Sequence, residues 1–301
     1  MTTPLNYEPI SLDRQEAYLR CFKTCPQKTS DYSFINLWAW AEVYGLSWAW
    51  ANDLVWIRQS RPQAVNWAPV GPWHSIDWTA PLLAPAGNHS IFSRVPEVLS
   101  QIWQQRFKNR LTIRDTRGAW DYLFAFEDLL HLKGNRYHRK KNLLNQFTKK
   151  YPYAYKPLGP ETIARALDMQ QDWCLWRDCE SSQTLSAENV AIQRVLSHWD
   201  RLQGVIGGAL MVDQTIAAYT VAEALSDEML LIHFEKADPL YKGGYQAINQ
   251  LFLKSFRGEF KQVNREQDLE DQGLRQAKLS YHPSGFLRKY EIVFSPQTVE
   301  E

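Results

Sequence analysis

The segment GVIGGALMVDQTIAAYTVAEALSDEMLLIHFEK, residues 204–236, decides the fold of this chain. It contains three apolar runs of strand length, at Gly204–Val212, Ile216–Ala224 and Met229–Lys236. The first two runs are separated by the short polar pair Asp213-Gln214, which suits the tight turn of a hairpin. The segment therefore predicts three consecutive antiparallel strands.

The sequence on either side of these strands alternates between helical and strand patterns. Two helices are expected before them, at Pro160–Arg177 and Ala187–Arg201. After them we expect a glycine turn at Tyr241–Tyr245, a helix at Gln246–Arg257, a strand at Phe260–Asn264, a helix at Asp271–Tyr281 and a strand at Tyr290–Phe294. This order predicts an α+β fold and is compatible with an N-acetyltransferase-like (GNAT) domain.

The first half of the chain shows a similar alternation. Helices are expected at Leu12–Thr24, at Ser30–Tyr44 with Ser30 as N-cap, and at Val95–Asn109. Short strands are expected at Leu46–Trp50, Leu54–Ile57, Arg110–Arg114 and Tyr122–Phe126. The chain of 301 residues is long enough for two domains. We place them at residues 1–150 and 151–301.

Composition restricts the functional classes. The hydrophobic content is 45% and the net charge is +1, so nucleic-acid binding can be argued only from local charge clusters. The segment Met1–Ile10 does not resemble a secretory signal. The longest apolar runs are shorter than the roughly 20 residues that a membrane helix needs. We expect a cytoplasmic protein without an integral membrane segment.

The four cysteines form two close pairs, Cys21/Cys25 and Cys174/Cys179. Their spacings differ from those of zinc sites, and no other cluster has the spacing of metal ligands. We expect four reduced, structural thiols and no bound metal.

Tryptophan is unusually frequent, with 13 residues, ten of them between Trp38 and Trp120. Buried aromatic rings fill much core volume, which is the simpler interpretation. The alternative is a row of aromatic rings on which a sugar, a base or a lipid headgroup stacks.

A basic segment runs from His131 to Lys150 and contains seven lysines and arginines but no acidic residue. Lys133, Arg136 and Lys140 follow one another at spacings of three and four, which would align them on one side of a helix. Together with Lys141, this stripe predicts a site for phosphates of tRNA, a cofactor diphosphate or an anionic headgroup. A solvated basic surface is the alternative.

The glycine pair Gly243-Gly244 stands between a predicted strand and a predicted helix. Backbone amides at such a helix start can bind phosphate, as at the pyrophosphate site of acetyltransferases. A turn that needs glycine only for its backbone geometry explains the same pair.

Candidate catalytic residues gather in the sequence NREQD, residues 264–268, and in the following helix. Glu266 and Asp268 stand two apart, so in extended chain they would share a face. One of them could accept a proton from an attacking amine or hydroxyl, or both could recognise the ammonium group of an aminoacyl donor. Glu223 and Glu235, on neighbouring predicted strands, are secondary candidates for the base.

Cationic and phenolic groups accompany these carboxylates. Asn264 and Arg265 lie beside Glu266, and Arg275, Lys278 and His282 recur at spacings of three and four. The cations could neutralise a phosphate or a developing oxyanion, and Tyr281 could donate a proton to the leaving oxygen. A structural ion-pair network that ties the last helix to the sheet is the alternative.

Three stretches resemble the family of phosphatidylglycerol lysyltransferase C-terminal domains. They are SDYSFINLW at 30–38, KGNRYHRKKNLLNQF at 133–147, and NRE at 264–266 with GLRQAKLSYHP at 273–283. The resemblance implies two tandem GNAT-like domains, each with a mixed, mostly antiparallel sheet flanked by helices. It also implies transfer of an aminoacyl group from a charged tRNA to a lipid hydroxyl. The characterised members carry a membrane-embedded domain, and we expect none in this chain because its apolar runs are too short.

The sequence thus favours an acyltransferase that moves an aminoacyl group from aminoacyl-tRNA to a hydroxyl or amine. The acceptor would be a small molecule or a lipid headgroup. Direct attack is expected because no motif of a serine or cysteine nucleophile is present. No cofactor is required by this reaction. The alternatives are an acyltransferase that uses acyl-coenzyme A, and a non-catalytic module that binds an amino acid, a nucleotide or tRNA.

Overall fold

The computed structural model describes residues 5–78, 90–256 and 259–295. The chain forms two compact units. The first contains the residues up to Asp121, the segment Gln267–Asp271 and the chain from Leu287 onward; the second contains Tyr122–Glu266 and Gln272–Phe286. Each unit is built on one seven-stranded sheet flanked by helices, which confirms the predicted α+β class.

The sheet of the first unit has the order β1-β2-β3-β4-β5-β14-β6. Only the β4–β5 pair is parallel. Its strands are β1 (Glu8–Pro9), β2 (Ser47–Ala51), β3 (Leu54–Gln59), β4 (Val65–Trp67), β5 (Ile91–Pro96), β6 (Leu111–Asp115) and β14 (Lys289–Phe294). The longer helices are α1 (Gln15–Lys23), α2 (Phe34–Tyr44) and α3 (Glu97–Phe107).

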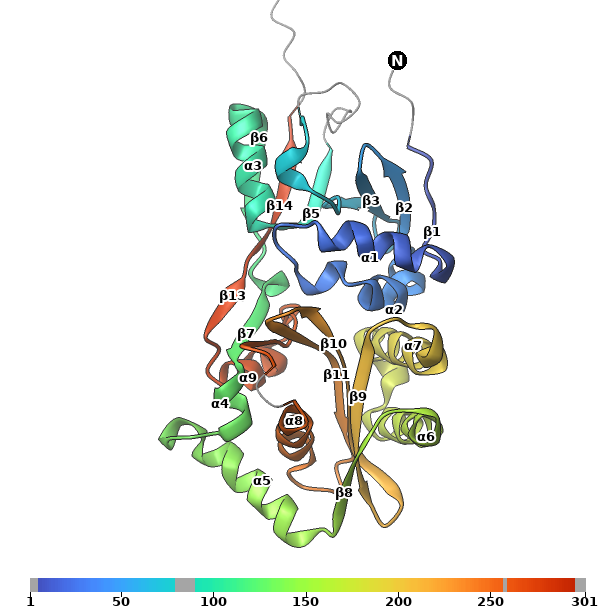
Figure 1. The fold of residues 1–301 in the computed structure, drawn as a ribbon, viewed down its shortest axis with the longest axis vertical. Helices are drawn as coiled ribbons and strands as arrows, with labels where there is room; N and C mark the ends of the chain where they lie inside the picture. Colours follow the sequence, from blue (N-terminus) through green and yellow to red (C-terminus); the bar gives the residue numbers. More distant parts are fainter. Residues whose placement is uncertain (1–4, 79–89, 257–258, 296–301) are drawn as a thin grey trace, which may run out of the picture. The chain divides into compact units, whose positions relative to one another are not determined.

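The sheet of the second unit has the order β13-β7-β12-β11-β10-β9-β8 (Figure 1). Its strands are β7 (Asp121–Ala125), β8 (Tyr153–Pro157), β9 (Val205–Val212), β10 (Thr215–Ser226), β11 (Met229–Ala237), β12 (Gln262–Asn264) and β13 (Gly285–Leu287). Its helices are α4 (Phe126–His131), α5 (His138–Lys150), α6 (Pro160–Arg177), α7 (Gln183–Ser197), α8 (Gly244–Lys254) and α9 (Gln272–Leu279).

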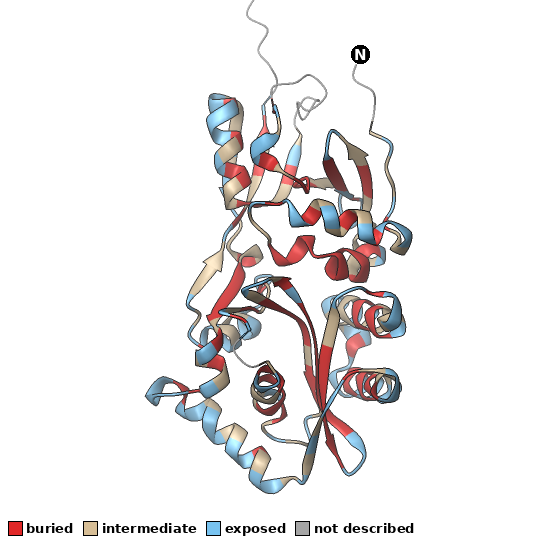
Figure 2. Cartoon of the chain, in the orientation of Figure 1, coloured by how far each residue is buried: buried red, intermediate tan, exposed pale blue. Residues whose placement is uncertain are grey.

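The three predicted strands at residues 204–236 are confirmed as β9, β10 and β11, and they are antiparallel. Helices α6 and α7 cover one face of this sheet and α8 covers the other (Figure 1). The sides of these helices that face the sheet are buried, whereas α5 is largely exposed (Figure 2). Between them, α8 and the sheet bury a core of small and aromatic side chains, including Ala218, Ala247 and Phe147.

The structure divides the chain elsewhere than at the predicted boundary at residue 150. The strand β7 joins the second sheet because it pairs with β12, so the second unit begins at Tyr122. The strand β14, near the end of the chain, joins the first sheet between β5 and β6. A linear division misses both features, because the pairing of distant strands leaves no local signal in the sequence.

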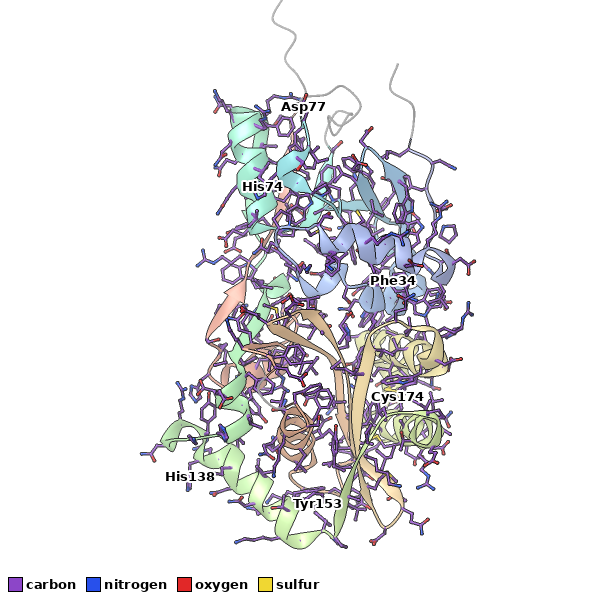
Figure 3. The ribbon with its side chains drawn as sticks, in the orientation of Figure 1. Phe34, His74, Asp77, His138, Tyr153 and Cys174 are labelled. Carbon is purple, nitrogen blue, oxygen red and sulfur yellow. A yellow bond between two sulfur atoms is a disulfide. The ribbon has the colours of Figure 1, made fainter. Side chains whose placement is uncertain are left out.

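The predicted first or last residues of several helices were also wrong. The second helix begins at Phe34, labelled in Figure 3, because Ser33 rather than Ser30 is its N-cap; Ser33 Oγ accepts a hydrogen bond from Asn36 N at 3.0 Å. Helix α9 ends at Leu279, short of Tyr281. Helix α8 ends at Lys254, and its predicted end at Arg257 lies outside the described residues.

The prediction of four reduced cysteines was wrong for one pair. Cys174, labelled in Figure 3, forms a disulfide with Cys179. The helix α6 ends in left-handed Asp178, and this reversal brings the two Cα atoms to 5.1 Å. Cys21 and Cys25 are free thiols, and burial raises their pKa values to about 11 and about 12.

Tryptophan fills the core of the first unit. Trp48, Trp73, Trp78 and Trp103 are each less than 2% exposed. Trp78 and Trp103 pack edge to face with ring centroids 5.5 Å apart, a favourable aromatic geometry. Core filling is therefore confirmed for these four residues.

A buried polar cluster joins distant segments of the first unit. We call it the polar clasp; it consists of Ser30, Asp31, Arg94, Asp121, Gln267 and Lys289. The ammonium group of Lys289 is fully buried and lies 2.6 Å from Asp121 Oδ1, and it also binds Asp31. Burial alone would raise the pKa of Asp31, but Lys289 and Arg94 outweigh it and hold that pKa below its usual value.

The contribution of the polar clasp to stability can be tested by removing its buried lysine. Removing one partner of a buried ion pair leaves an uncompensated charge and costs about 3–5 kcal/mol. We therefore expect Lys289→Met to lower the free energy of unfolding by that amount, measured by urea titration with tryptophan fluorescence.

The matched control is Arg20→Ala, which removes the exposed pair with Glu16. Such a surface pair contributes about 0.5 kcal/mol or less. Equal effects of the two substitutions would contradict a stabilising role of the clasp.

None of the helices in the described ranges is long and apolar enough to cross a membrane.

Candidate functional site

The candidate site lies where β11 continues past its parallel neighbour in the second unit. Strand β12 pairs with β11 only from Met229 to Leu231, and its last paired residue is Asn264. His233 and Glu235 follow on β11, and the pairing of β11 with β10 shifts at His233, which lies between the paired residues Ile232 and Phe234. The residues after β12 meet these two side chains there.

Three charged side chains from neighbouring segments form a buried row. The Nδ1 atom of His233 lies 3.0 Å from Glu266 Oε1, and its Nε2 atom lies 3.0 Å from Glu223 Oε1 on β10. Burial lowers the pKa of His233, but the hydrogen bonds with the two carboxylates outweigh it and raise that pKa to about 9. At neutral pH His233 is therefore an imidazolium that donates to both carboxylates.

A tight turn carries Glu266. Its backbone is left-handed, with φ at 57°, and its N–H donates to Asn264 Oδ1 at 2.8 Å. Asn264 is fully buried, so this side chain fixes the turn from inside the unit. The Glu266 carbonyl accepts a hydrogen bond from Tyr122 N at 3.1 Å. Asn264 thus shapes the backbone of this turn.

Arg265 and Tyr281 form a second group, next to Glu235 of β11. The guanidinium of Arg265 binds the carboxylate of Glu235 and lies 4.9 Å from the ring centroid of Tyr281. The Tyr281 hydroxyl accepts a hydrogen bond from Gln246 Nε2 of α8 at 3.3 Å. Burial raises the pKa of Tyr281, with Arg265 and Gln246 opposing it only in part, so Tyr281 is a neutral phenol at pH 7.

Two lysines add positive charge next to this group. Lys140 Nζ on α5 lies 4.2 Å from the ring centroid of Tyr281, and burial together with the nearby Arg265 lowers its pKa. Lys278 Nζ on α9 donates to the carbonyl of Arg265 at 2.6 Å. Five predicted site residues are thus brought together in one unit: Glu266, Arg265, Tyr281, Lys140 and Lys278.

Asp268 is placed differently from Glu266. The prediction that both carboxylates lie on one face of an extended segment was wrong, because Glu266 is left-handed. Asp268 belongs to the first unit, is fully buried, accepts from Glu270 N at 2.9 Å and lies 3.5 Å from Arg117 Nη1. These contacts describe a buried structural carboxylate.

The predicted basic stripe is interrupted. Leu132 and Gly134 have positive φ, so a new helix begins after them and α5 starts only at His138, which is labelled in Figure 3. Lys133 therefore lies in an exposed loop, and Arg136 lies in a single 3-10 turn and binds Asp128 at 2.8 Å. Lys141 is exposed on α5, next to Lys140.

The cations expected on the last helix are also separated. Arg275 and Lys278 lie on α9 and are half-buried. His282 lies beyond the end of the helix, with φ at 55°, and its Nε2 is 3.2 Å from the carbonyl oxygen of Arg136. His282 therefore packs α9 against the start of α5.

The glycine pair is explained by packing. Gly243 has φ at 90°, and a Cβ atom there would lie 2.2 Å from the carbonyl oxygen of Leu143 on α5. A Cβ atom on Gly244 lies 3.1 Å from the Cβ of Ala237. Both glycines are accounted for by these contacts, and the turn alone offers no specific support for a diphosphate.

Sequence reasoning missed His233. A period-two pattern on β11 does not identify it, because the pairing of β11 with β10 shifts at this residue. Glu223, one of the two carboxylate partners of His233, was also a candidate. Its contact with His233 follows only from the register of β10 and β11. Within the described residues, no group of three or more His, Cys, Asp and Glu side chains is arranged to hold a metal ion.

The raised pKa of His233 predicts a pH effect on stability. A group whose pKa rises on folding, here from 6.5 to about 9, stabilises the folded state fully below pH 6.5 and loses this effect as the pH rises through 9. We therefore expect the urea midpoint of the wild-type protein to fall between pH 6.5 and 9.5 by more than that of His233→Gln. Parallel pH dependence of the two proteins would contradict a buried imidazolium.

Comparisons with known proteins show the family to which this chain belongs. Residues 22–293 match the model of the family "Phosphatidylglycerol lysyltransferase, C-terminal". An uncharacterised protein of Mycoplasmoides gallisepticum is 25% identical over 176 residues, which are 57% of this chain. The match spans 55% of that relative, about half of its length.

Solved structures agree with this match. A conserved protein of unknown function from Bacteroides thetaiotaomicron has a TM-score of 0.87 at 27% identity, covering 97% of this chain and all of that one. L-PGS from Bacillus licheniformis has a TM-score of 0.62 at 12% identity, covering 99% and 96%, and shows the same fold. The match to the family model extends over most of the chain, and the protein therefore belongs to the phosphatidylglycerol lysyltransferase C-terminal family.

Proposed function

We propose that the protein transfers an aminoacyl group from an aminoacyl-tRNA to a hydroxyl or amine acceptor. Family and fold indicate an acyl- or aminoacyltransferase of the GNAT-like type, related to lysyl-phosphatidylglycerol synthase. The observation that carries the proposal is a fixed carboxylate at Glu266, directly after an arginine that lies with Lys140 against the neutral phenol of Tyr281.

The reaction needs two proton transfers, and the site offers one group for each. The acceptor nucleophile attacks the ester carbonyl of the donor and loses its proton to the Glu266 carboxylate. The tetrahedral intermediate then expels the ribose oxygen of tRNA, which takes a proton from the Tyr281 hydroxyl. A carboxylate held by hydrogen bonds and a phenol with a raised pKa suit these roles.

Cationic groups stabilise the negative charge that develops on the carbonyl oxygen. Arg265 and Lys140 both lie within 5 Å of the Tyr281 ring centroid. A preorganised charge at that position is worth more than the same charge in water. The exposed Lys133 and Lys141 continue the positive surface toward solvent and suit contacts with tRNA phosphates.

Binding of tRNA is tested by titration. We expect the Lys133/Arg136/Lys140 triple-alanine variant to bind a pool of aminoacylated tRNAs more weakly than the wild type, because phosphate contacts are lost. The slope of log K against log salt should fall by about one for each lost contact. The control is Lys156→Ala, an exposed lysine on β8.

Acetyl-coenzyme A is titrated in parallel. Binding of acetyl-coenzyme A without binding of tRNA would replace the proposed donor by an acyl-coenzyme A. Binding of neither ligand would contradict transfer from both donors.

Catalysis is tested by transfer of radiolabelled amino acids from the same tRNA pool to phosphatidylglycerol vesicles, glycerol 3-phosphate and free amino acids. We expect Glu266→Gln to reduce transfer by about 10²–10⁴-fold, the usual contribution of a general base, while the affinity for tRNA stays unchanged. Unchanged transfer in this variant would exclude Glu266 as the base. Binding of tRNA without transfer by the wild type would make the protein a binding module.

A further inference from the structure

The row Glu223–His233–Glu266 contains a residue that cannot itself meet a substrate. The His233 side chain is fully buried, whereas Glu266 is 16% exposed and Glu223 is 9% exposed. Both ring nitrogens of His233 are occupied by carboxylate partners at 3.0 Å. No ring atom is left to take a proton from a ligand, so His233 can act only through its partners.

The row contains two carboxylates and one imidazolium. Glu223 and Glu266 each lie 3.0 Å from a ring nitrogen of His233. Two nearby cations also have contacts elsewhere: Arg265 is paired with Glu235, and Lys278 binds the carbonyl of Arg265. The imidazolium links the two carboxylates through its ring.

We infer that Glu223 and His233 are positioning residues that hold the Glu266 carboxylate in one orientation for accepting a proton. Glu223 anchors one ring nitrogen, so the other nitrogen is aimed at Glu266. The turn fixed by Asn264 presents Glu266 from the other side. Together these contacts leave the carboxylate little freedom, as a preorganised base requires.

This arrangement separates the two roles open to Glu266. A carboxylate that recognised the ammonium group of a donor would gain most from facing that cation alone, because a second cation weakens the attraction. Glu266 already has a permanent cation at hydrogen-bond distance, which weakens its attraction for the ammonium group of a donor. The reaction step in this inference rests on the proposed function, whereas the geometry does not.

Nuclear magnetic resonance of histidine-labelled protein between pH 5 and 10 tests the geometry. The signal of His233 is assigned from its absence in His233→Gln. We expect it to titrate near pH 9, and Glu223→Gln to move the midpoint down by at least one pH unit because one carboxylate partner is lost. The matched control, Glu188→Gln, removes a carboxylate of the same unit that pairs with Lys236, and should leave the midpoint unchanged.

The transfer assay tests the positioning role. Glu223→Gln should lower turnover by about 10–100-fold, as small misplacements of catalytic groups do, with the affinity for tRNA and the thermal midpoint close to those of Glu188→Gln. A wild-type His233 that titrates near pH 6.5, a midpoint unmoved by Glu223→Gln, or wild-type turnover in that variant would overturn the inference. The expected titration in a protein without transfer activity would instead refute the proposed function alone.

Discussion

The candidate site depends on one buried cation, the imidazolium of His233. Its two ring nitrogens lie 3.0 Å from the carboxylates of Glu223 and Glu266, and a buried charge needs such partners at hydrogen-bond distance. The same cation joins three segments of the sheet, since its partners come from β10 and from the turn after β12. Its contribution is therefore both electrostatic and geometric.

The end of β12 explains why the chemistry gathers at this point. Strand β11 continues beyond its last residue paired with β12, and Asn264 turns the chain so that Arg265 and Glu266 meet different residues of β11. The neutral phenol of Tyr281 lies next to Arg265 and Lys140. One short turn thus connects the row of Glu223, His233 and Glu266 with the group of Glu235, Arg265 and Tyr281 within a single unit.

The sequence predicted those parts of the fold that depend on local patterns. Three strands at residues 204–236 were found because apolar runs and a polar turn are local features. The assignment of β7 and β14 to their sheets was not predictable in the same way, because strand pairing between distant segments is decided by packing. The disulfide Cys174–Cys179 depends on left-handed Asp178, which no spacing rule reveals.

The same difference between local patterns and distant contacts applies to the candidate site. Glu266, Arg265 and Tyr281 were found because they stand close together in a stretch that resembles a known family. Asp268 was grouped with them because its spacing suits a strand, but the left-handed backbone of Glu266 removes that periodicity. His233 was missed because its importance arises only from the register of two strands. Sequence spacing therefore located the candidate site, but the contacts between its residues could be seen only in the structure.

The most direct test of the account is a crystal structure with a stable donor analogue, in which an amide replaces the ester that links lysine to the 3′ position of adenosine. We expect the amide carbonyl to lie within hydrogen-bond reach of Arg265, Lys140 or the Tyr281 hydroxyl, with Glu266 on the side open to an attacking nucleophile. Binding of the analogue elsewhere on the protein, with no contact to these residues, would contradict the assignment of the site.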